Sequence, residues 1–408
     1  MGIVDSTTRA AAERLDREDP LAGLRDRFRL PPDGTIYLDG NSLGMLPEAS
    51  VRRAHEVLTR EWGEGLIGSW ESGWLTMPQR VGDLLGERLL GAGPGQVLVA
   101  DSTTVNLYKL AVAALDARPG RDVLVADRND FPTDRYVLQG LAAARGLTLR
   151  LLDTPELAAP SPEAVAAAAD DRTALVVLSH VDYRSAAVAD LAGVTAAAHA
   201  AGALMLWDLC HSVGALPVRL DASGADLAVG CTYKYLNAGP GAPAFLYVRR
   251  EHQTALRQPI WGWFGQVDQF AMGPGYDPVP GVTRFLVGTP PVLGLALVEE
   301  GVLLLAEAGI DRLRDKGMAL TTLAADFTDA WLAPLGFGLA SPRDPAARGS
   351  HLSLSHPDAA RLCRELVHAA RVVPDFRAPD RIRLGLAPLT TRYVDVWDAL
   401  DRLRRLAS

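Results

Sequence analysis

Three short apolar runs between residues 203 and 248 constrain the fold of this chain more than any other feature. The first run, ALMLW, ends at Asp208, and the second, 225–230, is followed by the segment CTYK, which ends in Lys234. The third run ends at Val248. Short apolar runs bounded by Gly, Pro and polar turns are typical of strands buried on both faces. A carboxylate and a lysine would then lie at the ends of two neighbouring strands, where open α/β sheets bind their ligands.

The alternation of strand and helix continues upstream of these runs. Four further apolar strands are expected, at 96–100, 122–126, 147–152 and 173–178. Helices are expected between them, and the strands are apolar along nearly their whole length. This pattern predicts an α/β fold in which helices cover both faces of a mainly parallel sheet. The three runs and the four upstream strands together predict seven strands.

A change of scale beyond this region indicates a second, smaller domain. Two long helices are predicted between residues 292 and 332, and shorter strands and helices alternate in the tail. We therefore expect a large domain over 47–291 and a small α/β domain over 292–408. The N-terminal arm, 1–46, is expected to complete the small domain.

The composition argues against several classes of partner. The chain has 408 residues, of which 48% are hydrophobic, and its net charge is −8 without runs of Lys or Arg. This balance argues against nucleic acid. No apolar stretch approaches the roughly 20 residues that a membrane span needs, and the N-terminus lacks a signal peptide's apolar core. Three scattered cysteines (Cys210, Cys231 and Cys363) predict neither a disulfide framework nor a metal site. We expect a cytoplasmic protein.

The pair Asp208 and Lys234 suits one particular cofactor. A partly desolvated lysine loses its proton readily and can form a Schiff base. A shielded aspartate keeps a pyridine nitrogen protonated, so that the ring accepts electrons. Taken singly, Asp208 is equally well explained as a helix N-cap and Lys234 as a solvated loop lysine. Together they predict that Lys234 carries pyridoxal phosphate and that Asp208 holds its ring nitrogen.

Hydroxyl side chains at 102–104 open a predicted helix that runs to about Leu115. Such a helix start suits a phosphate, although an ordinary Ser/Thr N-cap has the same appearance. The sequence contains neither GxGxxG after its first strand nor GxxxxGK[ST], so rival nucleotide-binding folds lack their phosphate loops. Phe131, after a strand end, is either core or a cover for the cofactor ring. Trp70 lies in a Trp- and Gly-rich segment that predicts either packing or an aromatic pocket.

Motifs spread over much of the chain resemble those of the kynureninase family, a group of pyridoxal-phosphate enzymes of fold type I within the class V aminotransferase-like superfamily. The matching segments are YLDGNSLG (37–44), STTVNLY (102–108), FPTD (131–134), WDLCHSVG (207–214), TYKYLNAGPG (232–241), GWFG (262–265) and GTPP (288–291). The resemblance implies hydrolysis of L-kynurenine, or of 3-hydroxykynurenine, to anthranilate or 3-hydroxyanthranilate and L-alanine. That reaction belongs to tryptophan catabolism and supplies NAD biosynthesis.

The resemblance also implies roles for individual residues. Lys234, Tyr233 and Asp208 would be catalytic. Cofactor contacts are implied for Lys234, Asp208, His211, Thr103, Thr104, Phe131, Asp134 and Tyr233, and for Trp263 and Thr289 of a neighbouring subunit. Arg383 would bind the substrate carboxylate, and Ser42 and Trp70 would lie near the substrate's aromatic end. The family's shared sites imply a homodimer.

Other functions remain open on the sequence alone. A cysteine desulfurase or class V aminotransferase would share the fold, but a desulfurase needs a reactive cysteine on a mobile loop, whereas Cys363 lies in a predicted helix. A kynureninase variant that acts on a modified kynurenine in secondary metabolism is a third possibility. A regulator without catalysis would not need the lysine, aspartate and arginine.

Overall fold

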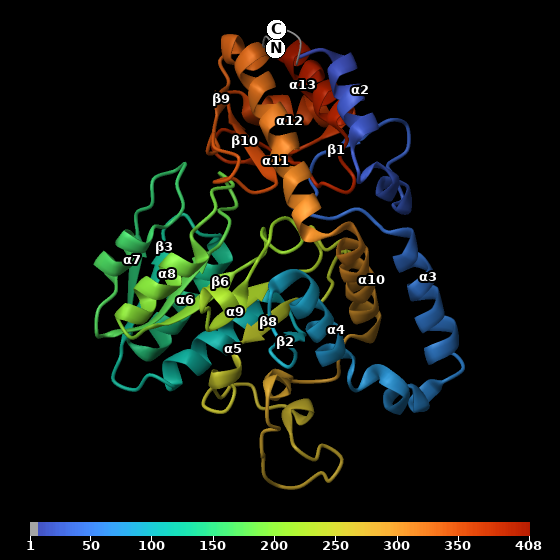
Figure 1. Cartoon of the computed structure of the whole chain (residues 1–408). Helices are drawn as coiled ribbons and strands as arrows, with labels where there is room; N and C mark the ends of the chain where they lie inside the picture. The colour runs from blue at the N-terminus through green and yellow to red at the C-terminus, as the bar shows by residue number, and fades with distance from the viewer. Residues whose placement is uncertain (1–6) are drawn as a thin grey trace.

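A seven-stranded sheet forms the centre of the computed structural model, which describes residues 7–408 (Figure 1). Residues 1–6 of the predicted N-terminal arm lie outside the described residues. The strands are β2 (Val97–Val99), β3 (Val123–Asp127), β4 (Thr148–Leu152), β5 (Thr173–Ser179), β6 (Leu204–Asp208), β7 (Leu227–Gly230) and β8 (Phe245–Val248). Their order is β2-β8-β7-β6-β5-β3-β4, and β8 is antiparallel to the other six strands. The predicted mainly parallel sheet of seven strands is confirmed.

Helices cover both faces of this sheet. They are α4 (Met77–Leu85), α5 (Thr103–Asp116), α6 (Pro132–Arg145), α7 (Pro162–Ala168), α8 (Leu191–Ala200), α9 (Leu220–Ser223) and α10 (Val292–Ala308). Because side chains alternate along a strand, Met205 of β6 packs into one apolar cluster and Leu206 into another on the opposite face. Both faces of the sheet are therefore buried, which explains why its strands read as continuous apolar runs.

Helix α10 packs with the large sheet. Its Val298 and Leu305 belong to the same apolar cluster as Trp207 of β6, and that cluster continues to Leu313. The helix that follows the predicted boundary at Val292 therefore contributes to the packing of the large sheet, and the division into domains stays a prediction.

The C-terminal region builds two smaller sheets with a separate apolar cluster. Strands β12 (Asp375–Arg377), β13 (Arg381–Gly385), β10 (His351–Ser355) and β9 (Gly338–Leu339) form an antiparallel sheet in that order. Helices α11 (Ile310–Phe327), α12 (Ala359–His368) and α13 (Tyr393–Ala407) pack with it. Strand β1 (Ile36–Tyr37) pairs in parallel with β11 (Val372–Val373), so the N-terminal segment joins this region.

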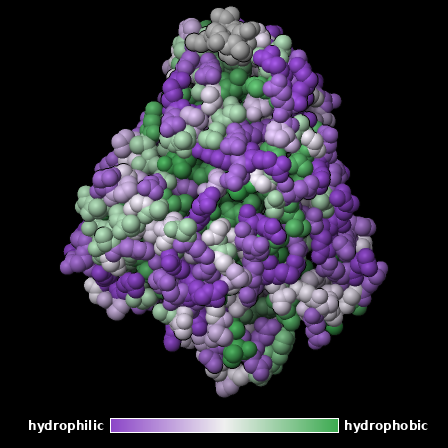
Figure 2. Space-filling model, viewed as in Figure 1, coloured by the Kyte–Doolittle hydropathy of each residue, from purple (hydrophilic) through white to green (hydrophobic). Residues whose placement is uncertain are grey.

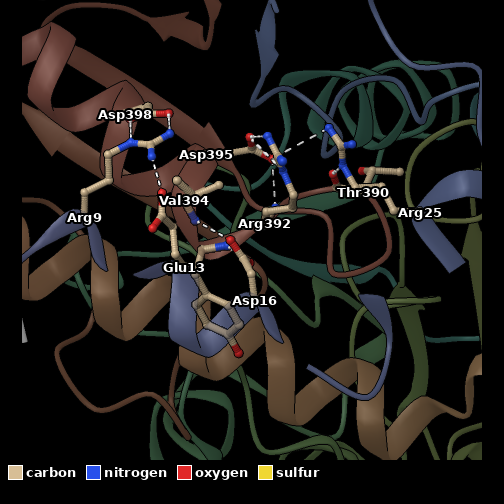
Figure 3. Close-up of polar contacts among 10 residues, drawn as sticks. Arg9, Glu13, Asp16, Arg25, Thr390, Arg392, Val394, Asp395 and Asp398 are labelled. Carbon is tan, nitrogen blue, oxygen red and sulfur yellow. Dashed lines mark hydrogen bonds and ion pairs between the residues drawn. The ribbon is translucent and has the colours of Figure 1, made fainter. Parts of the chain in front are cut away.

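The first helix, α2 (Arg9–Glu18), lies against the start of α13 (Figure 3). The carboxylate of Asp16 accepts hydrogen bonds from the backbone N–H groups of Tyr393, at 2.7 Å, and Val394, at 3.0 Å. These N–H groups belong to the first turn of α13 and have no partner inside the helix, so an acidic side chain there is favourable. Arg9 adds an ion pair with Asp398 at 2.8 Å.

Helix α3 (Glu48–Glu56) continues as a wider turn to Trp62. Short turns of 3-10 or π type lie at Ala22–Arg27, Leu66–Gly68, Trp70–Trp74, Gly86–Leu90, Arg250–His252, Trp263–Gly265, Val282–Phe285, Thr328–Leu332 and Ala333–Leu335. Within residues 7–408, no helix combines the length and the apolar composition that crossing a bilayer requires. Over the same residues, no group of three or more His, Cys, Asp and Glu side chains is arranged to hold a metal ion.

A segment between residues 261 and 288 projects from the bottom of the molecule as drawn in Figure 1. It exposes large apolar side chains at Trp261, Phe270 and Met272. Figure 2 shows apolar surface there, mixed with hydrophilic residues. An exposed apolar surface of this kind commonly marks a protein interface.

Candidate active site

A cavity of about 270 Å³ opens at the carboxyl ends of β3, β5, β6 and β7. This is the edge of the sheet at which the sequence places Asp208 and Lys234. Ten of the predicted site residues line the cavity, namely Ser42, Thr103, Thr104, Phe131, Asp134, Asp208, His211, Tyr233, Lys234 and Arg383. Residues that are far apart in the sequence therefore meet at one place.

Lys234 lies in the turn that follows β7. Its Nζ atom is 3.2 Å from Nε2 of His211 and 6.0 Å from the centre of the Phe131 ring. Burial, together with the positive charge of Lys234, holds the pKa of His211 well below its usual value. His211 is therefore neutral, and its Nε2 can accept a hydrogen bond from the lysine.

The turn at 39–44 packs against the lysine loop. The backbone N–H of Gly44 donates to the carbonyl of Tyr233 at 2.8 Å. A Cβ atom on Gly44 would lie only 2.3 Å from the carbonyl oxygen of Lys234, so no larger residue fits at this position. The same turn forms an isolated bridge from Asp39 to Gly385, next to the strand that carries Arg383. The N-terminal segment thus connects the lysine loop to the C-terminal sheet.

Two buried carboxyl groups face each other beside the lysine. Asp208 ends β6 and accepts a hydrogen bond from the backbone N–H of Cys210 at 2.7 Å, while Asp134 lies in the first turn of α6. Burial raises the pKa of Asp134 well above its ordinary value, and the nearby charge of Asp208 raises it further. Behind them, burial raises the pKa of Asp130 to about 7. Carboxyl groups in this position are stabilised by a shared proton or by a cation brought into the cavity.

The start of α5 lies at another side of the cavity. Ser102 caps the helix, since its Oγ accepts from the backbone N–H of Val105 at 3.3 Å. Thr103 and Thr104 follow in the first turn, and both line the cavity. Their hydroxyls and the unpaired N–H groups of this turn suit a phosphate. Tyr233 also lines the cavity, and burial raises the pKa of its phenol.

Arg383 is almost completely buried at the side formed by the small sheet. Its guanidinium donates to the carbonyl of Tyr183 at 2.7 Å and to Oγ of Ser42 at 2.9 Å, and it forms an ion pair with Asp375. With the side-chain amide of Asn41 turned so that its oxygen faces the arginine, Nε of Arg383 donates to that oxygen at 2.8 Å. The arginine is thus fixed in place by contacts from three separate parts of the chain.

The structure adds residues that the sequence did not identify. Asn41, Tyr183 and Arg377 line the cavity as well. The rings of Phe131 and Tyr183 form a T-shaped contact, with 5.3 Å between their centres. Tyr183 follows the end of β5, so its position after a predicted strand is a signal that points to the site, and Asn41 stands inside a motif. Arg377 lies on a three-residue strand that leaves no comparable signal.

Three predicted residues do not line the cavity of their own chain. Trp70 packs edge-on against Trp74, at 5.3 Å between ring centres, and lies near Phe264. Its role in a substrate pocket therefore finds no support within a single chain. Trp263, on the projecting segment, is 42% exposed, and Thr289, directly after that segment, is exposed as well. The predicted contribution of these two residues to a neighbouring subunit's site stays a prediction.

The residues that line the cavity fit pyridoxal phosphate. A lysine can attach it covalently, the carboxyl pair is suited to a protonated ring nitrogen, and the start of α5 is suited to a phosphate. Phe131 is exposed by 37% at the mouth of the cavity, where an aromatic ring can cover the cofactor.

Comparison with known proteins gives one consistent result. The chain is 47% identical to a kynureninase from Burkholderia pseudomallei over 404 residues, which cover 97% of this chain and 95% of that protein. A kynureninase from Pseudomonas fluorescens is 45% identical over the same length, with the same coverage. This chain belongs to the kynureninase family. Residues 36–331 also match the family model for class-V aminotransferases, and residues 313–403 match the model for the kynureninase C-terminal domain.

Solved structures with the same fold are more distant in sequence. A cysteine desulfurase from Thermococcus onnurineus superimposes with a TM-score of 0.80 at 17% identity, covering 97% of this chain and 98% of its own. A mutant of C-DES with glycine linked to its pyridoxal-phosphate cofactor gives 0.81 at 19% identity, covering 93% and 98%. At these identities the likeness concerns the fold alone, and it confirms the predicted fold type.

The thiols of this family member argue against desulfurase chemistry. Cys363 is buried in α12, and burial raises its pKa to about 11. A thiol that stays protonated inside a helix is a poor nucleophile. Cys210 lines the cavity, but its hydrogen bond with Cys231 and its burial raise the pKa of its thiol well above the ordinary value, and Cys231 is buried.

Proposed function

We propose that this chain hydrolyses the Cβ–Cγ bond of L-kynurenine, with pyridoxal phosphate as its cofactor. One kynurenine and one water would give one anthranilate and one L-alanine. The observation that carries the proposal is the position of Lys234, which shares one cavity with the buried carboxyl pair and with Arg383. An amino acid whose carboxylate binds Arg383 would present its Cα–H bond to the lysine.

Each side chain has a distinct task in this proposal. The cofactor, when bound, supplies an electron sink that makes the bonds at the substrate's Cα and Cβ labile. Lys234 removes and returns the proton at Cα, and neutral His211 accepts a hydrogen bond from its amine. Tyr233, whose raised pKa keeps the phenol protonated, relays a proton for the attack of water on the γ-carbonyl. Asp208 keeps the ring nitrogen protonated.

Arg383 and Ser42 would select the substrate. The guanidinium of Arg383 suits a carboxylate, because it stays positively charged and donates charge-assisted hydrogen bonds. Oγ of Ser42 accepts a hydrogen bond from Nη2 of Arg383 at 2.9 Å, so its hydroxyl lies beside the carboxylate site. Comparison of kcat/KM for kynurenine and 3-hydroxykynurenine in the wild type and in Ser42→Ala would show whether this hydroxyl discriminates between the two.

We further propose a homodimer with shared active sites. The exposed apolar side chains of the 261–288 segment favour contact with a second copy, and both Trp263 on that segment and Thr289 directly after it are exposed. In mixtures of inactive Lys234→Ala and Trp263→Ala chains, hybrid dimers should recover part of the activity, since one of their sites has both residues intact. Exchange of subunits without any recovery would count against a shared site.

A cytoplasmic location is also proposed, with a role in tryptophan catabolism. Its support is that all three cysteines are unpaired thiols, as is usual in a reducing compartment.

The function is tested with purified protein and its cofactor. The wild type should release fluorescent anthranilate from kynurenine and absorb visible light through the bound cofactor. Lys234→Ala should lose both turnover and the visible absorbance of the covalently bound cofactor. Lys234→Arg keeps the positive charge and should still be inactive. Sulfide release from cysteine, in place of anthranilate release, would identify a desulfurase instead.

A further inference from the structure

Four charged side chains share one face of the β12–β13 pair. Asp375 lies directly opposite Arg383 in the ladder, and Arg377 lies opposite Arg381. Alternate residues of a strand point to the same side, and residues paired across a ladder share that side. Of these four residues, Arg377 and Arg383 line the cavity.

The two arginines at the cavity share one carboxylate. Oδ2 of Asp375 lies 2.9 Å from Nη2 of Arg377 and also forms the ion pair with Arg383. Arg381 is engaged elsewhere, with Glu156 and with Asp380 at 2.6 Å. Asp39 is the other acidic group within electrostatic range, and burial raises its pKa to about 6.

The two guanidinium groups differ in how many of their N–H donors are in use. A guanidinium has about five N–H donors. Those of Arg383 already reach Tyr183, Ser42, Asp375 and, in the orientation given above, Asn41. Arg377 has one ionic partner among the described residues, Asp375, and its Nε is buried without a hydrogen bond.

A carboxylate that binds in two-point fashion needs two free, parallel N–H groups. Arg383 has about one left after its contacts within the chain. Arg377 has several, and about a third of its side chain (35%) is exposed at the cavity wall. The geometry therefore favours a carboxylate held between the two arginines.

We propose that Arg377 is a second arginine of the substrate-carboxylate site. Asp375 holds the two guanidinium groups side by side, Arg383 donates to one carboxylate oxygen, and Arg377 donates to the other. The inference rests on the proposed function, in which Arg383 binds the α-carboxylate. Without Arg377, the negative charge of Asp375 would be balanced by Arg383 alone. Asp375 would then repel the substrate's carboxylate more strongly.

The test compares two small ligands of the cofactor-loaded enzyme. L-Alanine carries the carboxylate, and ethylamine has the same amine and carbon atoms without it. Dissociation constants are read from the change in the visible spectrum on titration, so no turnover is needed. Arg377→Gln should bind L-alanine about 10- to 100-fold more weakly, because hydrogen bonds to charged groups typically contribute this factor. Ethylamine binding should be unchanged, and Arg377→Lys should recover part of the loss.

A matched control separates a contact with the ligand from a loss of structure. Arg381→Gln removes a guanidinium from the same face of the same strand pair, but one that does not line the cavity. It should leave both ligands unchanged. Equal weakening of L-alanine and ethylamine in Arg377→Gln, or no weakening of either, would overturn the proposal.

The same ligands keep this inference distinguishable from the proposed function. If the wild type released no anthranilate from kynurenine, the proposed function would fail, yet the alanine and ethylamine titrations would still report on Arg377. If Arg383→Gln weakened L-alanine while Arg377→Gln did not, Arg383 would be the sole arginine of the site, and the inference alone would be wrong.

Discussion

Two buried aspartates at opposite edges of the central sheet differ in how they are satisfied. Asp208 ends β6, whereas Asp226 precedes β7, so in these parallel strands they lie at opposite edges. Asp226 accepts hydrogen bonds at 2.7 Å from Nε2 of both His199 and His252 and from the backbone N–H of Met205. Burial would raise its pKa, but these hydrogen bonds outweigh burial and lower the pKa to about 2.

The carboxyl pair at the other edge has the opposite character. Asp134 and Asp208 face each other, and burial raises the pKa of Asp134. A side chain with all its partners in the chain stabilises the fold. A buried carboxyl pair that lacks enough partners costs stability and marks a place for a ligand that brings positive charge. The comparison separates a structural carboxylate from a functional one without reference to any relative.

The largest expected effect is on catalysis, in Asp208→Asn. An amide cannot stabilise a protonated ring nitrogen as a carboxylate does, so kcat should fall by about 10²- to 10³-fold, as on loss of other electrostatic groups at reacting centres. The unfolding free energy of the cofactor-free protein should hardly change. Steady-state release of anthranilate and urea unfolding measure the two quantities.

The matched variant for this prediction is Asp226→Asn, with the same change of side chain at the opposite edge. Its kcat per folded molecule should stay within about twofold of the wild type, since Asp226 has no contact with the cavity. Equal losses of kcat in both variants would mean that the assignment of Asp208 to catalysis and of Asp226 to structure is wrong.

The second effect is on stability, in the same Asp226→Asn variant. Loss of the charge leaves two histidines and a backbone N–H with a weaker acceptor, so unfolding free energy should fall by about 2–4 kcal/mol. Urea unfolding of the cofactor-free protein at pH 7 measures the change. A loss below about 0.5 kcal/mol, the usual range for surface changes, would show that Asp226 contributes little to the stability of the fold.

The third expected effect is a gain in stability, in the variant Asp134→Asn. Because the folded pKa of Asp134 lies above its unfolded value, the folded protein binds more protons there, and stability falls as pH rises above about 4. The amide removes this dependence. At pH 8 the cofactor-free variant should therefore be more stable than the wild type by about 1 kcal/mol, and at pH 4 the difference should vanish. A destabilised variant at pH 8 would mean that the carboxyl pair is already satisfied.

Much of this architecture is predictable from the sequence, for physical reasons that differ by region. Strands buried on both faces leave continuous apolar runs, so the seven-stranded sheet, and Asp208 and Lys234 at its edge, follow directly. The small sheet is harder, because strands of two or three residues such as β9 and β12 carry almost no periodicity.

Site residues show a similar division. Residues at or within a few positions of a predicted strand end, such as Asp208 and Phe131, are found by the position of that end. Arg377 reaches the cavity only through the fold of the small sheet, and such a long-range contact leaves no trace in local sequence. Arg383 is likewise identified by the family resemblance alone, because no local spacing rule points to it.

The smallest expected effect is the pH dependence that His199 gives to the structural edge. The hydrogen bond to Asp226 raises the pKa of His199 above its ordinary value. A raised pKa means that this contribution is complete below the unfolded value of about 6.5 and is lost as pH rises through the folded pKa. His199 is partly exposed, so the contribution should be only about 0.5–1 kcal/mol. Unfolding free energies of the wild type and of His199→Gln should therefore differ at pH 6 and converge by pH 9. His368→Gln, on the exposed face of α12, is the control and should show no such convergence. A difference that grows with pH would mean that His199 binds Asp226 in its neutral form, and the direction of this prediction would then be wrong.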